Sequence, residues 1–119
     1  MTAVQISNTI KVDGLLNEEE WKLAKPSPRF VQIEPQQGMP ANFETEVKVL
    51  YNRQYLYVGF ICHDSLGKKA IRATDFRRDF GIRSHDHVAL SFDGFNDTRN
   101  AMALMANAYG VQKRLACVR

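Results

Sequence analysis

The sequence predicts an all-β protein built as an antiparallel β-sandwich, and one segment carries most of this prediction. Residues Thr45 to Asp64 form two apolar stretches joined at Asn52-Arg53-Gln54. Their side chains alternate with the period of two that is typical of β-strands. The second stretch is apolar on both faces, with Leu56, Val58, Phe60 and Cys62 on one and Tyr55, Tyr57, Gly59 and Ile61 on the other. We therefore expect this strand to lie inside a sheet that is covered on both sides.

The N-terminal part predicts one short strand and one short helix. Ile10 to Val12 is expected to be a strand that turns at Asp13-Gly14, a dipeptide suited to positive backbone angles. Asn17 is expected to cap a helix over Glu18 to Ala24, since three consecutive glutamates stand in its first turn. Pro26 ends this helix.

The rest of the chain predicts strands separated by turn-rich loops. Three further strands are expected in chain order, at Phe30–Ile33, His85–Asp93 and Arg99–Asn107. The last two are joined by the hairpin loop Gly94–Thr98. The final stretch, Val111–Val118, is weakly patterned, and the sequence does not decide whether it is a strand.

Size and composition indicate one globular domain over residues 1–119, with 45% hydrophobic and 24% charged residues. The net charge is only +3, and no nucleic-acid-binding module is recognisable, so no nucleic acid is expected as a partner. No apolar run reaches membrane-spanning length, so no membrane insertion is expected. The first residues lack the pattern of a secretion signal, which leaves the compartment undecided.

Two kinds of side chain suggest metal or redox chemistry. Cys62 is expected to be a small buried apolar residue, although a disulfide to Cys117 stays open. His85 and His87 stand two apart on one expected strand and so share a face, where Asp93 is a candidate third metal ligand. Two ligands rarely make a tight site, and solvent-facing histidines are the preferred interpretation.

The acidic residues do not indicate an enzyme. Ser84, His85 and Asp86 are triad residue types, but adjacent strand positions cannot converge on one reacting atom. Asp64, Asp86 and Asp93 are expected to hold strand ends and turns. The sequence therefore predicts a non-catalytic protein.

Several short motifs, in order, resemble a known family. Asp13-Gly14, Asn17-Glu18 and Trp21 are followed by Thr45-Glu46-Val47, and later by Asp86, Val88, Phe92-Asp93, Asn107 and Gly110. This series is similar to family 9 carbohydrate-binding modules, which also occur at the N-terminus of large bacterial envelope proteins. The resemblance implies a jelly-roll sandwich that binds rather than catalyses, and a periplasmic or extracellular location. No cofactor is expected, although family members often carry a structural calcium ion. Oxygen ligands for calcium would come from Asp75, Asp79, Asp86, Asp93 and Asp97, with none assigned.

The residues that clamp a sugar in this family are largely replaced. By alignment, a stacking tryptophan falls on Arg83, an acidic contact on Ala89 and an arginine on Met105, while Asn107 keeps its type. The only tryptophan, Trp21, has a structural place in the motif. The resemblance thus implies weak glycan binding on a face bearing Arg83, His85, His87 and Asn107.

Two alternatives to a glycan module remain. Family members continue for several more strands, so we expect a sheet edge here to be covered by a second copy, an exchanged strand or a partner chain. The chain would then be a structural or protein-interaction unit of a larger envelope protein. A third alternative is haem or small-ligand binding, with Met102 and Met105 and a histidine as iron ligands, although strand methionines usually serve packing.

Overall fold

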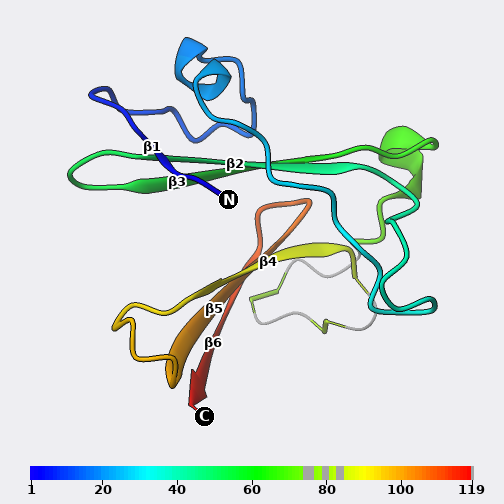
Figure 1. Cartoon of the computed structure of the whole chain (residues 1–119). Helices are drawn as coiled ribbons and strands as arrows, with labels where there is room; N and C mark the ends of the chain where they lie inside the picture. The colour runs from blue at the N-terminus through cyan, green and yellow to red at the C-terminus, as the bar shows by residue number, and fades with distance from the viewer. Residues whose placement is uncertain (74–76, 79–80, 83–84, 119) are drawn as a thin grey trace. The chain divides into compact units, whose positions relative to one another are not determined.

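The computed structural model describes residues 1–73, 77–78, 81–82 and 85–118 (Figure 1). The chain divides into two compact units, Met1–Ser65 and Leu66–Arg119. Each unit contains one three-stranded sheet. The prediction of an all-β protein is thereby confirmed, while the jelly-roll sandwich stays a prediction.

The sheet of the first unit brings the N-terminus against a long hairpin. Its strands are β1 (Val4–Gln5), β2 (Thr45–Tyr51) and β3 (Leu56–Cys62), in that spatial order. β1 runs parallel to β2, and β2 and β3 are antiparallel, as predicted for the hairpin. Asn52 closes the turn because its side-chain oxygen accepts the backbone N–H groups of Gln54 and Tyr55, at 2.9 and 2.8 Å.

One face of this sheet is covered by the N-terminal segment, and the core of the unit lies between them. The two sheet residues at its centre are Leu50, which has no exposed surface, and its cross-strand partner Tyr57. Ile6, Ile10, Trp21 and Ala24 pack onto them, with Val4 and Leu16 at the margin. Trp21 is thus a core residue, which agrees with the structural place predicted for it.

Gly59 shows how closely the covering segment approaches the sheet. A methyl group in place of its hydrogen would overlap Leu16 and would come within 3.1 Å of Trp21. A larger residue would require the Leu16 side chain to move, so glycine suits the close packing at this position. Gly59 thus interrupts the apolar side chains of β3 at the point where Leu16 and Trp21 of the N-terminal segment are nearest to the sheet.

The predicted helix over Glu18–Ala24 was wrong in type and in its cap. The structure has a single 3₁₀ turn, η1 (Glu19–Lys22), preceded by Glu18 rather than by a capping Asn17. Glu18 instead accepts a hydrogen bond from the Trp21 indole nitrogen, at 3.1 Å. Burial of the Trp21 ring, rather than helix propensity, determines the conformation of this segment.

Four other expectations for the first unit are corrected by the structure. β3 is not an inner strand, because among the described residues it pairs with β2 alone and forms an edge. Cys62, expected to be buried, is an exposed free thiol. Ile10–Val12 is not a strand, and Phe30–Ile33 is reduced to one bridge between Val31 and Pro40.

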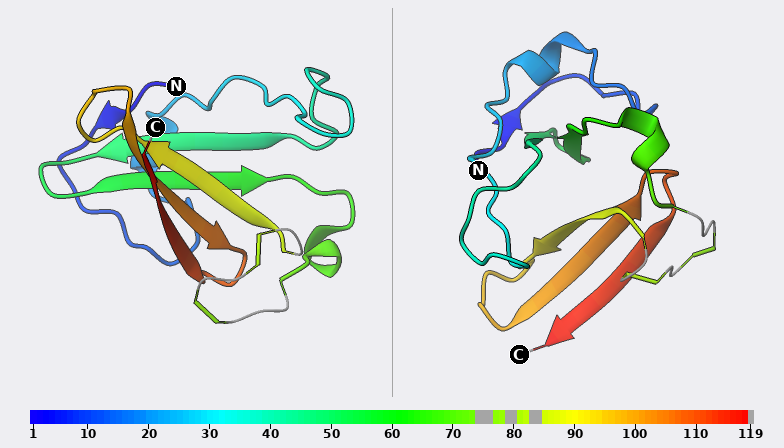
Figure 2. Two further views of the ribbon diagram at one scale, coloured as in Figure 1. Left: turned by 90° about the horizontal axis from the view of Figure 1, so that it is seen from below. Right: turned by 90° about the vertical axis from the view of Figure 1, so that its right-hand side faces the viewer.

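The second unit is an antiparallel meander. After the short 3₁₀ turn η2 (Gly67–Ala70), its strands are β4 (His87–Phe92), β5 (Asn100–Asn107) and β6 (Gln112–Val118), in sequential order (Figure 2). The two strands predicted around the Gly94–Thr98 loop are confirmed with trimmed ends. The weakly patterned C-terminal stretch is also a strand. Within the described part of the chain, no helix has the length and apolar character needed to cross a membrane.

Candidate ligand-binding sites

The predicted binding face is partly assembled in the second unit. His87 opens β4 and stands directly opposite Asn107 of β5 in the register. His85 precedes the strand, and its carbonyl oxygen lies 2.9 Å from Nδ1 of His87. Arg83 lies outside the described residues. The structure therefore brings together three of the four predicted residues, although only His87 and Asn107 are strand residues.

Asn107 has a structural task that its sequence position did not reveal. Asn107 is only 6% exposed. Its Oδ1 accepts the backbone N–H groups of Tyr109 and Val111, both at 3.0 Å. Gly110, with φ of 78°, completes this β5–β6 turn. The amide oxygen of Asn107 is therefore engaged in holding the turn, which explains why asparagine and glycine are spaced three apart here.

Asp86 and Asp93 of the second unit hold a strand end and a turn, respectively, as predicted for them. Asp86 exchanges hydrogen bonds with the backbone of Arg72, both at 2.8 Å. Asp93 accepts the N–H groups of Asp97 and Thr98, and these bonds, led by that of Thr98, lower the pKa of its carboxyl group.

Asp97 organises the other end of the same loop. Its Oδ1 accepts the N–H groups of Asn100 and Arg99, each at 2.9 Å, and its Oδ2 accepts the Asn100 side chain at 2.7 Å. The bond from the Asn100 backbone is the main cause of the lowered pKa of Asp97. These bonds stabilise a loop in which Asn96 and Thr98 have positive φ angles of 52° and 58°.

The geometry offers little support for a metal or haem site. Among the described residues, no three histidine, cysteine or acidic side chains gather as a metal-binding group. Asp75 and Asp79, two of the candidate calcium ligands, lie outside those residues. Met102 and Met105 stand opposite Phe92 and Ala89 in the register, so they project from opposite faces of β5 and cannot ligate one iron together.

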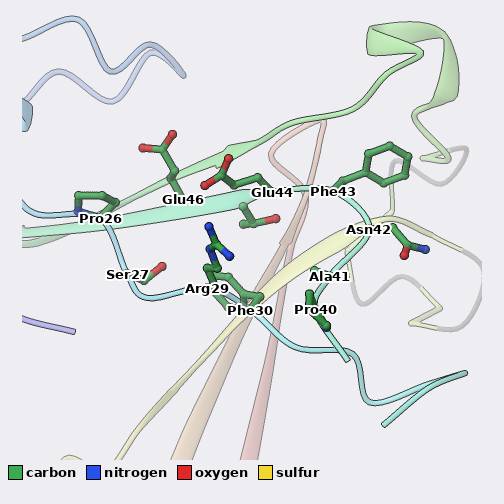
Figure 3. A pocket seen from close by; sticks show the side chains of 11 residues that line it. Pro26, Ser27, Arg29, Phe30, Pro40, Ala41, Asn42, Phe43, Glu44 and Glu46 are labelled. Carbon is green, nitrogen blue, oxygen red and sulfur yellow. The ribbon is translucent and has the colours of Figure 1, made fainter. Parts of the chain in front are cut away.

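A groove in the first unit is the other candidate site (Figure 3). Its volume is about 450 Å³, within the range of small-molecule sites in proteins. Two stretches of chain form its walls, and both belong to this unit. The lining residues are Pro26, Ser27, Arg29, Phe30, Pro40, Ala41, Asn42, Phe43, Glu44, Thr45 and Glu46.

Backbone hydrogen bonds fix these two stretches relative to each other. Ser27 N–H donates to the carbonyl oxygen of Val47 at 2.9 Å, and Ala41 N–H donates to that of Phe30 at 3.1 Å. The Gln32 side chain donates to the Pro40 carbonyl at 2.8 Å and to Asn42 Oδ1 at 3.1 Å. Main-chain bonds and the Gln32 side chain thus fix the two walls, and the side chains of Ser27 and Asn42 also take part in this bonding.

The groove combines exposed aromatic rings with charged groups. Phe30 and Phe43 are 43% and 52% exposed, so two aromatic rings of the groove are open to solvent. In Figure 3 the Arg29 side chain extends toward the start of β2, where Glu44 and Glu46 stand. Glu46 Oε1 lies 3.3 Å from Nε2 of His63, whereas no ion pair within the described residues involves Arg29 or Glu44.

Sequence reasoning missed this groove because it assigned Phe30–Ile33 to a strand. The available signal was the spacing of Pro26, Pro28, Pro35 and Pro40, which disfavours a regular ladder across the segment. An aromatic residue beside an arginine, in a proline-punctuated loop, is better interpreted as an exposed loop than as sheet.

Comparisons of the chain with protein-family models, with curated proteins and with solved structures gave no match. The resemblance to family 9 carbohydrate-binding modules therefore rests on the sequence motifs alone.

Proposed function

We propose that the chain is a non-catalytic binding module whose ligand is a glycan, held in the groove of the first unit. The observation that carries this proposal is the pairing of half-exposed Phe30 and Phe43 with the charged groups of Arg29 and Glu44, which lack ion-pair partners among the described residues. Aromatic rings pack against the apolar C–H face of a pyranose. Guanidinium and carboxylate groups can each bond two neighbouring hydroxyls.

Binding is expected to be weak. The groove is open to solvent, and the His87–Asn107 face contributes little, since the Asn107 oxygen already accepts two backbone bonds. A ligand that is only partly enclosed loses fewer water contacts, so we expect dissociation constants of about 1 mM. The motif resemblance supports the same ligand class and the same non-catalytic role.

An NMR titration of the isotope-labelled protein tests both the ligand and its place. Soluble sugars such as glucose, galactose, cellobiose and xylobiose are added, and pull-downs with insoluble polysaccharides are run in parallel. Shifts confined to the amides around Arg29, Phe30 and Glu44 support the groove. Shifts confined to His85, His87 and Asn107 would instead restore the face implied by the resemblance.

Matched variants separate binding from folding. Phe30→Ala is expected to weaken sugar binding about tenfold, because one stacking partner is lost. Arg29→Ala is expected to weaken it similarly. The controls are Val31→Ala, which changes an exposed neighbour (59% exposed), and Arg53→Ala, which removes a cation outside the groove. If no sugar shifts any amide and no polysaccharide retains the protein, the glycan proposal is rejected.

The second candidate function is a structural or protein-interaction unit. The observation that favours it is the uncovered edge of β3 in the described sheet. A partner that co-purifies stoichiometrically while all sugars fail would decide for this candidate.

A further inference from the structure

Among the described residues, β3 has no strand partner besides β2, so its outer edge presents backbone groups in a defined pattern. Two bonds at the ends of the β2–β3 ladder show which residues of β3 bond to β2. His63 N–H donates to the Glu44 carbonyl and Asn52 N–H donates to the Tyr55 carbonyl, both at 2.9 Å. Odd-numbered residues of β3 therefore direct their backbone groups toward β2. The even-numbered residues, Leu56, Val58, Phe60 and Cys62, direct theirs outward.

This edge differs from the other sheet edges because it has none of the usual protection. β3 has seven residues without a charge or a proline. By contrast, β1 has only two residues, β6 includes Lys113 and Arg114, and β4 stands between Asp86 and Asp93. Short length and charge are the common means by which an edge avoids pairing with another chain. β3 is therefore the edge best suited to accept a further strand.

The sequence of β3 also suits pairing with itself. In an antiparallel arrangement with Gly59 opposite Gly59 of a second copy, Val58 faces Phe60 and Leu56 faces Cys62. All four positions are outward-directed, so each pair can exchange two hydrogen bonds, which makes about eight between the chains. No like charges meet along the ladder, and Arg53 before the strand comes toward Asp64 after it.

We propose that β3 is a self-association edge, through which two copies of this chain form a continuous six-stranded sheet about a two-fold axis at Gly59. The exposed side chains at its ends, Leu56 (49% exposed) and Cys62, become cross-strand neighbours in the dimer. A ladder of seven residues buries less surface than a typical stable interface. The dimer is thus expected to form at high protein concentration and to dissociate on dilution, and it does not depend on glycan binding in the groove.

Sedimentation equilibrium over rising protein concentration tests the proposal. The expected weight-average mass rises from 13.6 kDa toward twice that value. Val58→Pro removes an outward N–H without removing a bond to β2, so it is expected to keep the protein monomeric at every concentration. Val58→Thr keeps that N–H and the branched side chain, and is expected to dimerise like the parent. Trp21 fluorescence reports whether each variant is folded.

A cross-linking variant tests the register without a proline. In a Cys117→Ser background, Leu56→Cys places a thiol opposite Cys62 of the second copy, at a separation that a disulfide can span. Oxidation is expected to yield a covalent dimer in most of the protein. Val12→Cys, which exposes a thiol elsewhere (90% exposed), is expected to yield at least tenfold less. A constant monomer mass, or equal cross-linking by both variants, would overturn the proposal.

Discussion

The two sheets of the chain have the same number of strands, but the contacts described around them differ in kind. In the first unit, side chains from distant segments gather on Leu50 and Tyr57 and form an apolar core. In the second, the described contacts are concentrated in turns, where Asp93, Asp97 and Asn107 bind backbone N–H groups. A three-stranded sheet becomes stable when an apolar face is covered. In the first unit, the N-terminal segment covers the apolar face of the sheet. In the second, side-chain bonds to the turns fix which residues of neighbouring strands pair.

The largest expected effect is the loss of the central core residue of the first unit. Leu50→Ala is predicted to lower the free energy of unfolding by about 2–5 kcal/mol, because a fully buried side chain leaves a cavity. Urea denaturation followed by Trp21 fluorescence measures it, since this is the single tryptophan and belongs to the same core. Leu15→Ala, at a 60% exposed position, is the control and should change stability by less than about 0.5 kcal/mol. Equal effects would contradict the assigned core.

The next effect tests how closely the cover approaches the sheet. Gly59→Ala is predicted to cost about 1–3 kcal/mol, because the added methyl group overlaps Leu16. Leu16→Ala in the same chain should recover part of this loss, since it removes the overlapping atoms. A double-mutant cycle measured by urea denaturation gives the coupling between the two positions. Strictly additive effects would show that the cover is not seated on Gly59.

A smaller effect is expected in the second unit. Asn107→Ala leaves the Tyr109 and Val111 N–H groups without their acceptor and is predicted to cost about 1–2 kcal/mol. Hydrogen exchange at these two amides should accelerate, while the Trp21 fluorescence midpoint stays unchanged if the units unfold separately. Gln112→Ala, at the exposed start of β6, is the control. A matching shift of the Trp21 midpoint would show that the units unfold together.

The smallest effect concerns pH and the β4–β5 loop. The pKa of Asp97 is lowered in the folded protein, so its contribution to stability is present above its ordinary pKa of about 3.8 and is lost as the pH falls through the lower folded value. Amide exchange at Arg99 and Asn100, corrected for its intrinsic pH dependence, should therefore lose protection below about pH 4. Asp97→Asn should abolish this transition. If the transition persists in that variant, Asp97 is not its cause.

Local sequence patterns predicted the strands well, but they did not predict which distant segments contact each other. Alternation defined the β2–β3 hairpin, and turn residues separated β4 from β5. The edge position of β3 was not predicted. Side-chain alternation indicates which faces of a strand are buried, but it does not indicate how many neighbour strands bond to its backbone. β1 was missed since two residues carry no periodicity, and β6 was left undecided although β5 supplies its partner.

The candidate sites were predicted less well than the strands. The pairing of His87 with Asn107 follows from the register of two predicted strands, so it was accessible from the sequence. The groove was not, because it depends on the bridge between Val31 and Pro40, and a single bridge leaves no pattern. The turn-holding role of Asn107 could have been inferred from the glycine that follows three residues later.

The parallel pairing of β1 with β2 has a consequence for synthesis of the chain. Val4 and Gln5 pair with Leu50 and Tyr51, so they have no partner strand until the hairpin, which is made later, has emerged from the ribosome. Until then Ile6, Ile10 and Trp21 stay in contact with water or with a chaperone. Long-range contacts of this kind slow folding, so the N-terminal segment is exposed to misassembly until the hairpin is complete.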